Sequence, residues 1–88
     1  MNFRLQYTQH AYDDLDSLER VRARRIVQKL DFFVAQENPL RFAKRLINGS
    51  AEYRFRVGDY RVLFDLNSQG EIIILLVLRV KHRREVYD

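Results

Sequence analysis

Hydrophobic and polar residues alternate along residues 53–57 of this 88-residue chain and again along residues 60–66. This period of two is typical of a β-strand with one buried face. Gly58 and Asp59 separate the two runs, and glycine accepts the positive φ that a two-residue hairpin turn requires. The pattern therefore predicts a β-hairpin closed by a two-residue loop.

The expected register of this hairpin places positive charges opposite each other. With a two-residue loop, Arg56 lies opposite Arg61 and Arg54 lies opposite Leu63, on the face that is not apolar. Like charges that face each other directly destabilise a sheet, and no folding role for Arg61 is evident. Sequences break such a local rule at functional surfaces, although arginines on an open sheet face also occur simply as solvated groups. The three arginines are therefore candidates for binding an anion.

Apolar residues recur at helical spacing before the hairpin. Thr8 is a suitable N-cap for a first helix over residues 9–15, because its hydroxyl can accept a hydrogen bond from the first turn. Asp16 and Glu19, three residues apart, resemble a capping pair that opens a second helix with an apolar stripe within residues 23–34. The polar side of that helix is basic and carries Arg20, Arg22, Arg24, Arg25 and Lys29.

The other segments complete the expected elements. Residues 2–7 alternate like a strand with one buried face, and Asn38-Pro39 fits the start of a short third helical piece over residues 40–47. The sequence Asn-Ser-Gln-Gly at residues 67–70 predicts a turn. Residues 71–80 follow it and are almost continuously apolar, which is typical of a central strand covered on both faces.

These elements predict an α+β fold formed by a single domain over residues 1–88. The expected sheet is four-stranded and mostly antiparallel, in the order 1-4-3-2, with the two main helices packed on one face. Strands 2, 3 and 4 form a meander, and strand 1 flanks strand 4. The length of the loop before strand 4 leaves open which face of the sheet carries Arg79.

Composition narrows the class of protein. The net charge of +4 and the pI of about 9.8 favour a polyanionic partner. The chain has no cysteine, which excludes disulfides and thiolate chemistry and fits a reducing cytosol. The longest apolar run, residues 72–78, is too short to cross a bilayer, and the N-terminus lacks the apolar region of a signal peptide. We therefore expect a cytoplasmic protein without a membrane partner.

The C-terminal residues are expected beside the hairpin tip, because strand 4 runs antiparallel to strand 3. At ~3.3 Å per residue, four polar residues then lie within roughly 15 Å of the hairpin arginines, namely Lys81, His82, Arg83 and Arg84. Tyr87 can fold back over the same face. Guanidinium groups match phosphate bidentately, and clustered cations stabilise the charge that develops on a phosphorane. Composition and spacing alone thus indicate a small basic α+β domain with a phosphate-binding surface.

The blocks YRFRVGDYRV at residues 53–62 and HRREVY at residues 82–87 resemble the RelE/ParE toxin superfamily, and the resemblance covers nearly the whole chain. It implies a RelE-like fold and a toxin of a type II toxin–antitoxin pair, held inactive by a RelB-like antitoxin from the adjacent gene. RelE-like members cleave messenger RNA in the ribosomal A site. The ribose 2′-hydroxyl attacks the adjacent phosphate, and neither a metal nor another cofactor is needed. The implied partners are the antitoxin, the ribosome and mRNA.

The resemblance also implies residue roles. Arg54 and Arg61 would hold the phosphate, and Tyr87 would take the 2′-hydroxyl proton or stack a base. Arg83 or His82 would assist departure of the 5′-oxygen, and an alignment ambiguity of one residue lets Lys81 compete for that place. The catalytic candidates are Arg54, Arg61, His82, Arg83 and Tyr87. The phosphate-binding candidates are Arg56, Lys81 and Arg84, and the ribosome-docking candidates are Arg22, Arg25 and Lys29.

Two alternatives remain open within the same resemblance. ParE-like members share the fold but bind and inhibit DNA gyrase without cleaving RNA, and a toxin-like scaffold without activity is a third reading. ParE-like members generally lack the full arginine–tyrosine set at the C-terminus. The combination of Arg54, Arg61, Arg83 and Tyr87 therefore favours the ribonuclease.

Overall fold

The computed structural model describes residues 2–47 and 49–86. The strands within these residues are β1 (Asn2–Tyr7), β2 (Ala43–Arg45), β3 (Tyr53–Val57), β4 (Tyr60–Gln69) and β5 (Ile72–His82). The helices are α1 (Gln9–Asp16) and α2 (Arg20–Val34), with short 3-10 helices η1 (Pro39–Phe42) and η2 (Arg83–Glu85). None of the described helices is long and apolar enough to cross a membrane.

The sheet has five strands in the order β1-β5-β4-β3-β2 and is mixed, because β1 pairs with β5 in parallel and the other pairs are antiparallel. The expectation of a four-stranded, mostly antiparallel sheet was therefore wrong. The additional strand β2 pairs with the outer edge of β3, with Ala43 opposite Phe55. Three residues are too few to show an alternating pattern, so β2 could not be recognised before its partner strand was in place. The α+β class holds.

The helix boundaries depart from the sequence pattern at two places. Thr8 caps α1 as predicted, since its hydroxyl oxygen accepts from the Ala11 N–H at 3.1 Å. Asp16 ends α1 instead of opening α2, and Glu19 precedes α2 without a capping hydrogen bond from its side chain. The third helical piece is only the four-residue η1, because the chain becomes extended at Ala43 to pair with β3.

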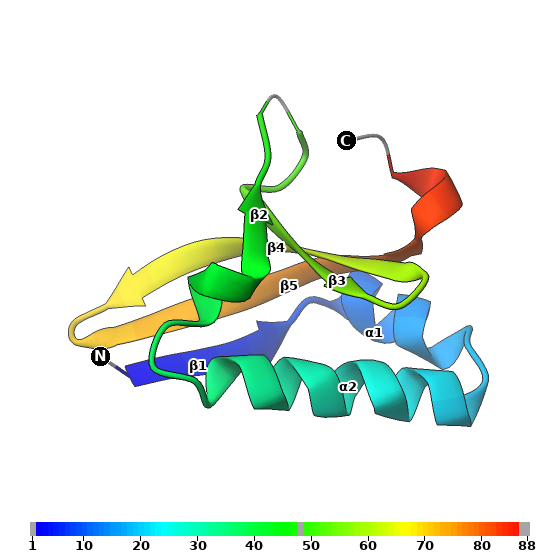
Figure 1. Ribbon diagram of the computed structural model, residues 1–88, viewed down its shortest axis with the longest axis horizontal. Helices are drawn as coiled ribbons and strands as arrows, with labels where there is room; N and C mark the ends of the chain where they lie inside the picture. Colours follow the sequence, from blue (N-terminus) through cyan, green and yellow to red (C-terminus); the bar gives the residue numbers. More distant parts are fainter. Residues whose placement is uncertain (1, 48, 87–88) are drawn as a thin grey trace.

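The hydrophobic core lies between the sheet and the two helices, which cover the same face of the sheet (Figure 1). Aromatic rings form its centre: the Phe55 ring stacks on Phe33 of α2 at 4.6 Å between centroids and on Phe64 of β4 at 4.5 Å. The segment after β2 and the C-terminal η2 both project from the opposite face of the sheet (Figure 1). That opposite face is thus bordered by chain segments but not covered by a helix layer.

The β4–β5 connection also differs from its prediction. Strand β4 continues to Gln69, and the turn consists of Gly70, with φ of 62°, and Glu71. A β-bulge then shifts the register, because Leu63 pairs with Arg79 whereas Phe64 pairs with Val77. The residue between them, Leu78, is the extra residue of the bulge. The bulge places Arg79 in register with Leu63, on the sheet face opposite α2. The sequence had not decided which face carries Arg79.

The outer edge of β5 beyond β1 is closed by α1. The Thr8 N–H donates to the Val77 carbonyl at 3.0 Å, and the Asp14 carboxylate accepts from the Val80 N–H at 2.8 Å. The same carboxylate accepts two hydrogen bonds from the Arg79 guanidinium, at 2.8 and 3.0 Å. Burial by itself would raise the pKa of Asp14, but these bonds from Arg79 and Val80 outweigh it and lower the pKa below its usual value. Backbone groups that an edge strand leaves open are therefore satisfied here.

Candidate functional site

Positive charge gathers on the sheet face opposite α2, which we call the cationic face. Side chains of directly paired residues point to the same side of a sheet, so cross-strand pairs form rows. One row consists of Arg56, Arg61 and Lys81. The next row on that face consists of Lys44, Arg54, Leu63 and Arg79. The two rows thus hold six cations and no carboxylate, and the predicted opposition of Arg56 and Arg61 is confirmed.

Arg61 has a structural role that the sequence did not reveal. Only 8% of it is exposed, and its Nη1 donates to the carbonyls of Gly58 and Tyr60, both at 3.0 Å. These bonds secure the hairpin turn and fix the direction of the guanidinium. Arg56, by contrast, is exposed to solvent. The facing cations are therefore tolerated because one is held by carbonyl oxygens and the other is hydrated.

The end of β5 lies beside the hairpin tip, as the topology predicted. The Arg83 N–H donates to the Asp59 carbonyl at 2.7 Å, and the Arg83 guanidinium lies 3.8 Å from the Asp59 carboxylate. Both side chains are largely exposed, so this ion pair adds little stability. It does hold Arg83 and the start of η2 at the border of the cationic face. Arg84 is exposed on η2, and Tyr87 lies outside the described residues.

His82 points away from the cationic face. It pairs with Tyr60, whose ring it meets edge-on at 5.5 Å, and the Tyr60 hydroxyl accepts from Arg22 of α2 at 3.4 Å. The His82 Nδ1 accepts from the Arg84 N–H at 3.2 Å. Lys81 is the neighbour that lies on the cationic face, opposite Arg61. The structure therefore brings Lys81 to the hairpin arginines and turns His82 to the helix side.

The basic residues of α2 are divided between two places. Arg22 and Arg25 line a pocket of about 450 Å³ between α2 and the hairpin tip. Lys29 lies further along the helix, with its ammonium 5.0 Å from the centroid of the Phe32 ring. The three predicted docking residues thus form a pair and a separate cation–aromatic contact rather than one patch.

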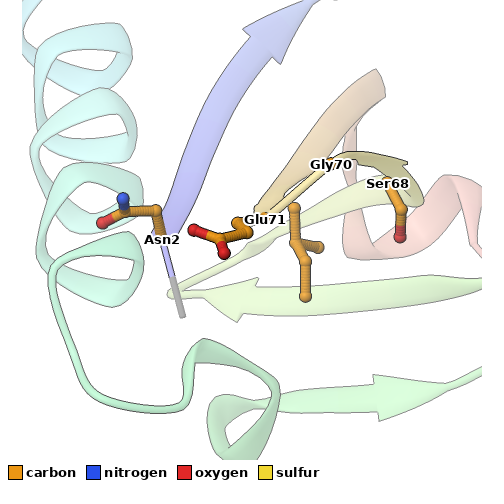
Figure 2. A pocket seen from close by; sticks show the side chains of 5 residues that line it. Asn2, Ser68, Gly70 and Glu71 are labelled. Atoms are coloured by element: carbon orange, nitrogen blue, oxygen red, sulfur yellow. The ribbon is translucent and has the colours of Figure 1, made fainter.

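Two further pockets differ in chemistry. A pocket of about 380 Å³ adjoins the cationic face and is lined in part by Gln9 and His10 of α1, which sequence reasoning had not connected with the sheet. Another, of about 610 Å³, lies at the far end of the sheet around Asn2 and Glu71 (Figure 2). Its lining contains a carboxylate and no cation, so it does not suit a phosphate. Among residues 2–47 and 49–86, no cluster of three or more metal-binding side chains is present.

The chain thus forms a small mixed sheet with helices on one face and cations on the other. Residues 5–87 match the family model of the ParE toxin of the type II toxin–antitoxin system parDE. The chain therefore belongs to this toxin family, within the RelE/ParE superfamily, and the predicted resemblance is confirmed. No curated protein sequence matches the chain.

Solved structures with the same fold include toxin–antitoxin complexes. The archaeal RelE–RelB complex of Pyrococcus horikoshii OT3 has a TM-score of 0.68 at 27% identity, covering 98% of this chain and 100% of that chain. The RelBE2 complex of Mycobacterium tuberculosis has a TM-score of 0.65 at 26% identity, covering 94% and 100%. The YoeB/ParE toxin of Agrobacterium tumefaciens, with a TM-score of 0.60 at 20% identity over 90% and 97%, shows the fold alone.

Proposed function

We propose that this toxin is a ribosome-dependent mRNA endoribonuclease. The observation that carries the proposal is the pair of adjacent rows on the cationic face, which bring several cations together on one surface, with Arg61 held in place by carbonyl oxygens. In the proposed reaction the ribose 2′-oxygen attacks the adjacent phosphorus and the bond to the 5′-oxygen breaks. The products are a 2′,3′-cyclic phosphate and a 5′-hydroxyl. Cations held in place before the reaction stabilise the charge that develops on the phosphorane.

In this mechanism Arg54 and Arg61 bind the scissile phosphate. The carbonyl contacts of Arg61 support this role, because they hold the guanidinium in position before substrate arrives. Lys81, opposite Arg61, is our choice for the proton donor to the 5′-oxygen, because its ammonium is a donor on the same face. His82 is less suited, since its ring packs on Tyr60 and its Nδ1 accepts a backbone hydrogen bond.

The remaining candidates have supporting roles in the proposal. Arg56 and Arg84 are exposed and would contact flanking phosphates, and Arg83 would contribute from the border of the face. Tyr87 would accept the 2′-hydroxyl proton or stack a base, a role that rests on the family resemblance. A RelB-like acidic antitoxin encoded by an adjacent gene is the proposed partner, because the cations of this face, of which Arg79 is already paired with Asp14, favour a polyanionic cover. Action on ribosomes implies a cytoplasmic location.

The second candidate function is ParE-like inhibition of DNA gyrase, which the matching family model favours. The decisive experiment runs two assays on the same preparation: ribosomes programmed with labelled message, and gyrase supercoiling. Message that is cut only when bound to the ribosome, with supercoiling unaffected, supports the ribonuclease. Intact message together with blocked supercoiling would replace it with the gyrase inhibitor.

A further inference from the structure

The pocket beside the cationic face has a mixed apolar and polar lining. Its volume is about 380 Å³, and Leu63 and Leu78 contribute apolar atoms to that lining. The polar lining includes Gln9 and His10, both exposed at the start of α1, and the cations Arg79 and Lys81. Apolar side chains next to hydrogen-bonding groups suit a nucleobase, and the cations suit the phosphate beside it.

The β-bulge contributes Leu78 to the lining of this pocket. Without the extra residue, β5 would keep one register along β4, and Leu78 would not occupy the unpaired position. The Thr8 hydroxyl donates to the Leu78 carbonyl at 2.9 Å and thereby ties the bulge to the start of α1. The Asp14 carboxylate holds Arg79, the next residue, from the same helix. Bulges of this kind redirect side chains and are over-represented beside active sites.

The position of the pocket matches the proposed path of the RNA. Leu63 lies in the same row as Arg54, and Lys81 lies directly opposite Arg61. Adjacent strands are about 4.8 Å apart, so Lys81, which lines the pocket, is the immediate neighbour of Arg61 across β4 and β5. A phosphate bound at Arg61 would therefore have a neighbouring base within reach of the pocket.

We propose that this pocket binds one base of the message next to the scissile phosphate, and that Gln9 and His10 read the edge of that base. The inference rests on the proposed ribonuclease function and adds a subsite that determines specificity. The Gln9 amide nitrogen donates to the Asp13 carboxylate at 3.0 Å, and a carboxylate can only accept. This bond uses the Gln9 donor, so the group that Gln9 has left to offer a base is its carbonyl oxygen, an acceptor. The pocket therefore prefers a base edge that presents a hydrogen-bond donor, such as an exocyclic amino group.

The test uses programmed ribosomes whose messages differ only at the bases that flank the cleavage site, including an abasic nucleotide. Gln9→Ala and His10→Ala should each lower kcat/KM about tenfold on the preferred base, which is within the usual value of a base contact. On the abasic message the two variants should equal the wild type. Ser50→Trp, which fills the pocket from its exposed rim, should behave in the same way. Asp16→Ala and Gln28→Ala, exposed on α1 and α2 outside the lining, are the matched controls.

A second readout does not depend on cleavage. A message with a 2′-deoxyribose at the cleavage site and a photoreactive base beside it should crosslink to the peptide that contains Gln9 and His10. Cleavage with unchanged base preference in both variants, or equal losses on the abasic message, would overturn the subsite while leaving the ribonuclease intact. Wild-type protein that cuts no message and forms no crosslink would overturn the ribonuclease and the subsite together.

Discussion

The two faces of the β3–β4–β5 sheet are built from alternate residues of the same strands, yet they serve different ends. On the helix side, Phe55, Val62 and Val77 have at most 1% of their surface exposed. On the other side, the same strands carry the cationic face. Apolar burial on the helix side supplies the driving force for folding. The opposite face can therefore carry facing cations even though they do not stabilise the fold.

Arg61 is a charged exception to this division. It lies on the cationic face, but it is buried and bonded to the hairpin carbonyls. A residue proposed to act on the substrate therefore also supports the hairpin that presents it. Arg61 should therefore contribute both to stability and to the proposed reaction, and both contributions can be measured.

The largest expected effect on stability comes from the core face. Phe55→Ala removes a ring that stacks on Phe33 and Phe64, and should lower the free energy of unfolding by about 3–5 kcal/mol. Arg56→Ala, on the exposed face of the same strand, should change it by about 0.5 kcal/mol or less. Urea unfolding of both variants measures the difference. Similar losses in the two would show that the cationic face is part of the folding core.

Arg61→Ala should lower both the activity and the stability of the protein. Cleavage of ribosome-bound message should fall about 10²–10³-fold, the usual cost of one preorganised donor. The free energy of unfolding should also fall by about 1–3 kcal/mol, because two carbonyls lose their donor. Arg61→Lys keeps the charge without the planar guanidinium and serves as the control for charge alone. Stability unchanged in Arg61→Ala would contradict the structural role.

Lys81 and His82 are adjacent on β5 but lie on opposite sides of the sheet, so their variants compare the two sides directly. Lys81→Met should reduce single-turnover cleavage about 10²-fold if its ammonium donates the proton. His82→Gln keeps a side-chain acceptor for the Arg84 N–H and should stay within a few-fold of wild type, since His82 packs on Tyr60. Pre-bound programmed ribosomes provide the assay. The reverse ranking would identify His82 as the proton donor.

Asp14 joins the helix layer to the edge of the sheet, and its contribution should depend on pH. Its pKa in the folded protein is below the value of about 3.9 in the unfolded chain. The ionised carboxylate therefore stabilises the fold above that pH, and this contribution is lost as the pH falls through the folded value. Asp14→Asn should cost about 1–2 kcal/mol at pH 7. Thermal melts should show a much smaller difference from wild type near pH 2.5, and Asp16→Asn, which is exposed, should show little at either pH.

The smallest effect is expected from the helix surface. Arg22→Ala and Arg25→Ala, at the pocket between α2 and the hairpin tip, should weaken ribosome attachment by a few-fold and reduce its salt dependence. Cleavage of message on ribosomes already bound should be unchanged. Lys29→Ala tests the separate site near Phe32. Loss of the chemical step in Arg22→Ala or Arg25→Ala would mean that the helix side also takes part in the reaction.

Features that depend on neighbours along the chain could be predicted from the residues alone. Alternation and a two-residue loop set the hairpin register, and with it the positions of Arg54, Arg56 and Arg61 on one face. The N-cap at Thr8 follows the same local logic. The family motifs at residues 53–62 and 82–87 could also be recognised from the sequence, because each is a short continuous block.

The other features could not be predicted, because they arise from contacts between segments that are distant in sequence. Strand β2 exists because β3 offers an open edge, which brings Lys44 into the cationic face. The bulge at Leu78 is held by Thr8, 70 residues earlier, and it settles the face of Arg79. Since no local period records a contact across such a separation, the face of His82 and the pocket at Gln9 and His10 could not be predicted from the pattern of residues.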